Sequence, residues 1–141
     1  MRKTTSLRLP EELRDRLAAA AEGQGTTLTA LVERYAREGL ATDAHHGIVF
    51  KPGPSGRRAT LAGGPDVWEL VTALRSTAGS EQDRINEVAD QFSIHPRQVT
   101  IALSYAADHP DEIETRIAAN EAALVEAHRA HEARQQLLDS A

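Results

Sequence analysis

The 141-residue chain contains no cysteine, and aromatic residues make up only 4% of it. Without cysteine there can be no disulfides, no thiolate metal sites and no cysteine nucleophile. The scarcity of aromatics, together with abundant alanine, favours helices over sheets. No apolar run approaches membrane-spanning length, and the first residues are polar and basic. We therefore expect a cytoplasmic protein without membrane contact.

The net charge of −5 argues against nucleic-acid binding, but it is unevenly distributed along the chain. Residues 1–41 hold seven Lys/Arg and six Asp/Glu, residues 42–75 hold four and three, and residues 76–141 hold five and twelve. Net charges are thus +1, +1 and −7 in chain order. Any attraction to nucleic acid is expected at the N-terminal end.

Residues 1–42 predict one strand and two helices. The strand covers residues 4–9 and stops at Pro10, which suits the first turn of a helix that ends at Gly23 or Gly25. The second helix is capped by Thr26 or Thr27 and runs to about Leu40, with Gly39 as a candidate early stop.

The rest of the chain predicts a linker with a small β-hairpin over residues 43–64 and a helical unit over 65–141. Residues 48–50 and 57–61 form the expected strands. Four helices follow, and a four-residue turn between the second and third gives a helix-turn-helix outline. The last helix begins at Pro110 and runs nearly to the C-terminus. The fold class is therefore mainly α.

The strand at residues 4–9 has no nearby strand to pair with, so its backbone needs a partner from another chain. Antiparallel pairing with the same strand of a second copy predicts a homodimer with a two-stranded ribbon, which fits the major groove of double-stranded DNA. Thr4, Ser6 and Arg8 then face outwards as base readers. Arg2 and Lys3 lie where phosphates would be.

These residues resemble the ribbon-helix-helix family of transcriptional repressors, of the Arc, MetJ and CopG type. The matching stretches are Thr4–Leu13, Leu17 and Gly25–Val32, and the resemblance covers about residues 3–41. It implies that the outward strand residues read bases and that Thr27 and Thr29 hold phosphate at a helix N-terminus. Thr5 departs from the aliphatic residue that the family often has at that position.

Residues 47–120 resemble the helix-turn-helix domains of bacterial antitoxins. The resemblance rests on Gly56-Arg-Arg, Pro65–Val71, the Phe92 turn, Gln98-Val99, Ala102–Ala106 and Asp108–Ile113. It implies a PIN-type nuclease toxin as partner, and the acids of the last helix suit a basic partner surface. Arg97 on the third helix and Arg57 and Arg58 on the hairpin are secondary DNA contacts to be tested. The acidic charge of this half favours packing or dimerisation instead.

Catalysis and metal binding have little support in the sequence. His45 and His46 lie in the linker and His128 and His131 share one helix face, but no third ligand stands at an obvious spacing. No nucleophile–base pair and no phosphate-binding glycine loop is present, so neither an enzyme nor a cofactor is expected. Two functions stay open. One is a DNA-binding repressor acting as the antitoxin of a toxin–antitoxin pair; the other is a stand-alone regulator whose C-terminal unit serves oligomerisation or effector sensing.

Overall fold

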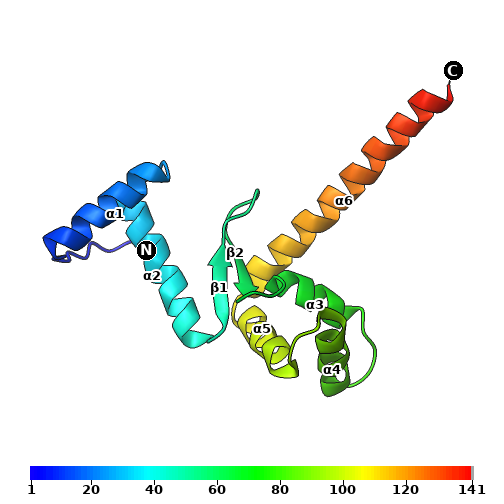
Figure 1. Cartoon of the computed structure of the whole chain (residues 1–141), viewed down its shortest axis with the longest axis horizontal. Coiled ribbons are helices and arrows are strands. Elements are labelled where there is room, and N and C mark those ends of the chain that lie inside the picture. Colours follow the sequence, from blue (N-terminus) through cyan, green and yellow to red (C-terminus); the bar gives the residue numbers. More distant parts are fainter. Residues whose placement is uncertain (141) are drawn as a thin grey trace. The chain divides into compact units, whose positions relative to one another are not determined.

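A computed structural model describes residues 1–140, which form six helices and one two-stranded antiparallel sheet (Figure 1). The prediction of a mainly helical protein is confirmed. Contacts divide the chain into two compact units, Met1–Ala44 and His45–Ala141.

The first unit contains helices α1 (Glu11–Gly23) and α2 (Leu28–Ala44), which pack on each other. The α1 start confirms the prediction, with Pro10 just before the helix and two acids in its first turn. The chain reverses at Gly25, whose φ of +66° lies in the left-handed region that glycine enters without strain. α2 continues to Ala44, so Gly39 does not stop it. One interior glycine costs a helix only about 1 kcal/mol, which the surrounding residues offset.

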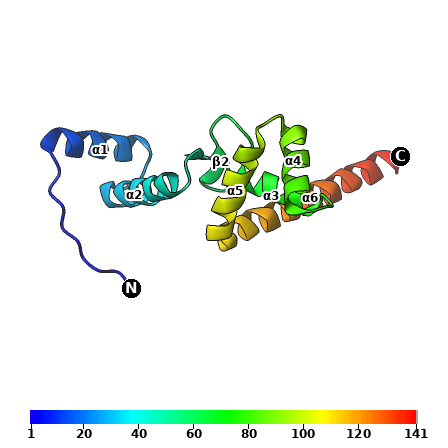
Figure 2. The same cartoon turned by 90° about the horizontal axis from the view of Figure 1, so that it is seen from below.

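The strand expected over residues 4–9 is absent from the single chain. Residues 1–10 carry no regular secondary structure and lead as a loop into α1 (Figure 2). A lone strand has no neighbouring strand to which its backbone can hydrogen-bond, and for the same reason the sequence predicts pairing with a second copy.

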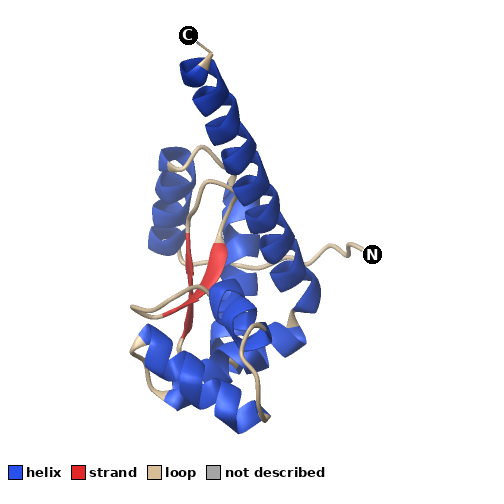
Figure 3. Ribbon diagram, turned by 90° about the vertical axis from the view of Figure 1, so that its right-hand side faces the viewer, coloured by secondary structure: helices blue, strands red, loops and turns tan. Residues whose placement is uncertain are grey.

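The second unit begins with the hairpin of β1 (Ile48–Lys51) and β2 (Arg58–Leu61), drawn in red in Figure 3. The strands pair antiparallel, with Ile48 opposite Leu61. The hairpin is an integral part of this unit rather than of a linker, because both strands contact α5 and β2 also contacts α3.

Three shorter helices build the body of the second unit: α3 (Val67–Arg75), α4 (Glu81–Phe92) and α5 (Pro96–Asp108). The apolar residues that recur at helical spacing in α3 are all buried, namely Val67, Leu70, Val71 and Leu74. α4 begins with a capping box, in which Ser80 and Asp83 exchange hydrogen bonds of 3.2 Å. Ser93, in the left-handed region at φ +55°, starts the turn into α5.

The last helix, α6 (Pro110–Asp139), is 30 residues long. Only Ile113 and Ile117 on it are buried, and they face α3 and α5, which are the elements that α6 contacts. Beyond Ile117, residues that recur at alternating spacings of four and three are all exposed, namely Leu124, Ala127, His131, Arg134 and Leu138. Within residues 1–140, no helix is both long and apolar enough to cross a membrane.

Candidate nucleic-acid interface

The predicted base readers lie on the exposed N-terminal segment. Thr4, Ser6 and Arg8 are exposed, as is every other residue from 1 to 10. No hydrogen bond or ion pair involves these three side chains within the described part of the chain. They are therefore accessible to a ligand, although the single chain does not arrange them on one face of a strand.

Arg2 and Lys3 were predicted to meet phosphates. In the single chain, Arg2 lies 3.5 Å from Glu33 on α2, and Arg37 donates to the same carboxylate at 2.9 Å. The hydrogen bond from Arg37 and the charge of Arg2 lower the pKa of Glu33. The Arg2 side chain is 89% exposed, so this contact leaves it open to a phosphate. Lys3 is exposed as well.

The predicted phosphate anchors lie at the N-terminus of α2. Thr27 caps the helix, because its Oγ1 accepts a hydrogen bond of 3.1 Å from the Ala30 amide. Thr29 is exposed in the first turn. The amides of Leu28 and Thr29 precede the first intrahelical donor, Leu31, whose amide bonds Thr27. Such free amides at the positive end of a helix are suited to an anion.

The first unit leaves much of its apolar surface uncovered. Only Ala21 and Leu31 are buried in it. Five large apolar side chains that follow Met1 in this unit are exposed: Leu7, Leu9, Leu13, Tyr35 and Leu40, with Leu7 and Leu40 each 72% exposed. A surface of this kind is typical of a chain that completes its core with a partner.

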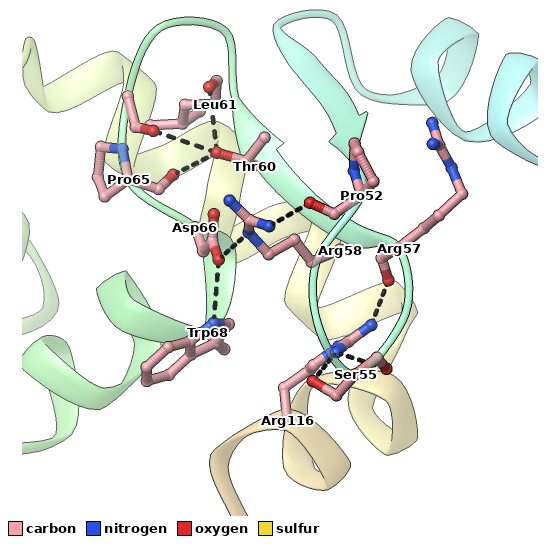
Figure 4. A network of polar contacts seen from close by, with 11 residues as sticks. Pro52, Ser55, Arg57, Arg58, Thr60, Leu61, Pro65, Asp66, Trp68 and Arg116 are labelled. Atoms are coloured by element: carbon pink, nitrogen blue, oxygen red, sulfur yellow. Dashed lines mark hydrogen bonds and ion pairs between the residues drawn. The ribbon is translucent and has the colours of Figure 1, made fainter. Parts of the chain in front are cut away.

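The two hairpin arginines differ in their surroundings (Figure 4). Arg58 Nε lies 2.6 Å from Asp66 Oδ2, and Arg58 Nη1 donates to the Pro52 carbonyl at 2.7 Å. These contacts fix the Arg58 guanidinium inside the unit and make it a poor wing for DNA. Arg57 donates to the Phe50 carbonyl at 3.3 Å, and its guanidinium points away from Asp66.

Arg97 is exposed in the first turn of α5. Its neighbour Gln98 is used in a cap, because Gln98 Oε1 accepts from the His95 amide at 3.0 Å. His95 Nδ1 accepts from the Arg97 amide at the same distance. Within its first turn, α5 therefore offers the exposed Arg97 as a charged group for DNA.

A polar cluster that the sequence did not indicate lies where the second unit starts. His45 is only 8% exposed, and its Nε2 is 2.9 Å from Asp108 Oδ2. Its ring meets the ring of Tyr105 edge-on, and Tyr105 stacks on His109 with centroids 4.3 Å apart. The Tyr105 hydroxyl donates to Glu112 at 2.7 Å. The cluster joins residues some sixty positions apart, so no local pattern announces it.

The described residues contain no cluster of side chains that could bind a metal ion. No group of three or more His, Asp or Glu side chains from 1 to 140 comes together to hold a metal ion. His128 instead lies 3.1 Å from Glu132 on its own helix.

Comparisons of the chain with protein-family models, with curated proteins and with solved structures find no significant match.

Proposed function

We propose that this protein is a homodimeric, sequence-specific DNA-binding repressor that reads the major groove with a two-stranded ribbon from residues 4–9 of each copy. Thr4, Ser6 and Arg8 contact base edges, and Arg2, Lys3, Thr27 and Thr29 hold phosphates.

The observation that carries the proposal is the incomplete core of the first unit. Leu7 and Leu9 are exposed in a segment whose backbone has no partner strand, while α1 and α2 expose Leu13 and Tyr35. Pairing two copies of the segment satisfies the backbone and covers the two leucines in one step. The alternation of the segment then leaves Thr4, Ser6 and Arg8 on the opposite face.

Selection from random DNA tests the proposal, because it requires no assumed operator sequence. The full chain is incubated with random duplexes at physiological salt, and bound DNA is amplified and sequenced over several rounds. We expect enrichment of short repeated or inverted sites that match the two-fold axis of the dimer. A pool that stays random after selection would refute sequence-specific binding.

For the C-terminal unit we propose a role as antitoxin, binding a nuclease of the PIN type through α6. This helix extends well past its last buried residue, Ile117, and exposes Glu121, Glu126 and Glu132. The acids of α6 complement a basic surface. A neighbouring gene for a small nuclease provides the test: its product should co-purify with the full chain and be inhibited by it.

A triple variant that combines Glu121→Gln, Glu126→Gln and Glu132→Gln should weaken that complex. Loss of the complex with retained DNA binding would assign the two activities to the two units. A chain that represses transcription and has no such neighbour or partner would support the alternative, a stand-alone regulator.

A further inference from the structure

The outer part of α6 has nothing to pack against in its own unit. From Glu121 to Asp139 every residue is exposed except Ala130, which is half-buried. Four large apolar side chains are among them: Leu124, Val125, Leu137 and Leu138, with Leu137 76% exposed. An isolated helix of this length is marginal in water, and most helices are stabilised by packing an apolar face. The outer part of α6 therefore needs a covering surface.

The same unit has an open apolar groove. It lies between α3, the start of α4 and α5, and has a volume of about 500 Å³. Val71, Leu74, Leu103 and Ala106 give it an apolar lining. Charged side chains from α3 and α4 also line it, namely Arg75, Glu81 and Arg84. Such a groove suits an amphipathic helix.

The α6 tip of the same chain cannot fill this groove. Glu114 on α6 pairs with Arg75, which lines the groove. Leu138 lies 24 residues further along an unbroken helix, which is about 36 Å at 1.5 Å per residue. Figure 1 shows this end of α6 leading away from α3, α4 and α5. The occupant has to come from another molecule.

The last turns of α6 match the groove in their apolar side chains and in one pair of opposite charges. Arg134 precedes Leu137 and Leu138 by three and four residues, so the three side chains share one helix face. Within the described residues, Arg134 and Glu81 each lack an ion-pair partner. Arg84 is held by a 3.1 Å hydrogen bond from its Nε to the Gly79 carbonyl. Leu137 and Leu138 thus face an apolar lining, and Arg134 is opposite in charge to Glu81, while Arg84 stays turned to the Gly79 carbonyl.

We propose that the end of α6 of one copy docks in the α3–α4–α5 groove of a second copy. Leu137 and Leu138 fill the groove, and Arg134 pairs with Glu81 of the other molecule. This contact is separate from the ribbon of the first unit, so it links two copies whether or not residues 4–9 pair.

Cysteine cross-linking tests the contact directly, because the natural chain has no cysteine. The full chain carrying Ala107→Cys, an exposed position in the groove lining, and Leu137→Cys is treated with a short bismaleimide. We expect covalent dimers and longer species on a denaturing gel. The matched control combines Ala107→Cys with Gln136→Cys, which lies next to Leu137 but about 100° further round the helix. It should yield at least tenfold less product, and equal yields from the two variants would overturn the proposal.

Charge reversal provides the second readout on the same cross-linked protein. Glu81→Arg and Arg134→Glu, each alone, should reduce the cross-linked fraction severalfold by placing like charges together. The two reversals combined should restore it. If the double variant stays as low as either single variant, the Arg134–Glu81 pairing is wrong. If neither reversal changes the yield, the docking mode is wrong.

Discussion

Arg58 Nε lies 2.6 Å from Asp66 Oδ2, and this ion pair ties β2 to the residue that precedes α3. Asp66 also accepts a hydrogen bond of 3.2 Å from Trp68 Nε1, so one carboxylate joins the hairpin, the start of α3 and the single tryptophan of the chain (Figure 4). Asp66 is only 8% exposed, which strengthens both contacts relative to a surface pair.

Substitution of Asp66 is therefore expected to loosen the second unit. Asp66→Asn removes the charge that holds Arg58 and should lower the free energy of unfolding by about 1–3 kcal/mol. Urea denaturation followed by Trp68 fluorescence measures the change, and the emission of the native state should shift because its indole partner has changed. Glu114→Gln is the control, since it breaks a pair with Arg75 in which both side chains are about half exposed. An unchanged midpoint for Asp66→Asn would contradict the structural role given to this pair.

Glu69, in the first turn of α3, gives a prediction with a defined pH dependence. Partial burial and the nearby charge of Asp66 raise the pKa of Glu69 above its ordinary value of 4.5. A raised pKa means that the ionised form is disfavoured in the folded state, so the penalty is present at neutral pH and disappears as the pH falls below 4.5. Glu69→Gln should raise the urea midpoint at pH 7 and leave it nearly unchanged at pH 4. A larger increase of the urea midpoint at pH 4 than at pH 7 would contradict this assignment.

The helical body could be predicted from the sequence where local signals decide the structure. The α3 stripe and the Ser80–Asp83 cap depend on residues three or four positions apart, and both are present. Tyr105 and His45 could not be predicted in this way. Their burial arises from contacts between the start of the unit and the end of α5, which no short pattern encodes.

For the candidate DNA-binding residues, the sequence predicts exposure but the single chain does not show their alignment. The sequence indicated exposed Thr4, Ser6 and Arg8, and they are exposed, but the strand that would align them is missing from the single chain. Its formation depends on hydrogen bonds from a second copy. For Arg58, the prediction of a DNA contact is disfavoured because its guanidinium pairs with Asp66, a contact across the turn between β2 and α3 that no short sequence pattern encodes.

The incomplete core of the first unit predicts how the dimer can be broken. Leu9→Asp places a charge where the ribbon is expected to pack on the helices, so the chain should dissociate from the ribbon dimer and lose helical signal from α1 and α2. Sedimentation velocity and circular dichroism measure both effects. Leu124→Asp is the control, because it places the same charge on an exposed leucine of the second unit, 62% exposed against 37% for Leu9, and should leave α1 and α2 helical. A Leu9→Asp chain with unchanged mass and DNA affinity would refute the ribbon.

Thr27 and Thr29 separate helix capping from phosphate binding. Thr27→Ala removes the Oγ1 acceptor of the Ala30 amide and should cost about 1 kcal/mol of stability, which Thr27→Ser restores. Thr29→Ala removes an exposed hydroxyl that bonds nothing in the described chain, so stability should stay constant while DNA affinity falls. Thermal unfolding paired with a DNA titration of each variant measures the two effects. If DNA affinity in both variants falls only as far as their stability falls, neither threonine contacts DNA.

Arg8 carries most of the predicted sequence preference, because its guanidinium can donate two hydrogen bonds to one guanine. Each such contact contributes about 1–3 kcal/mol, and a dimer makes two, so Arg8→Ala should weaken binding to the selected site by at least thirtyfold. Binding to random DNA should fall much less, since only one cation per copy is lost. Arg129→Ala removes an exposed arginine of α6 and should leave both affinities unchanged. Fluorescence anisotropy with the selected and a scrambled duplex measures the affinities of both variants and of the unchanged chain. A parallel loss on both duplexes would show that Arg8 contacts phosphate rather than bases.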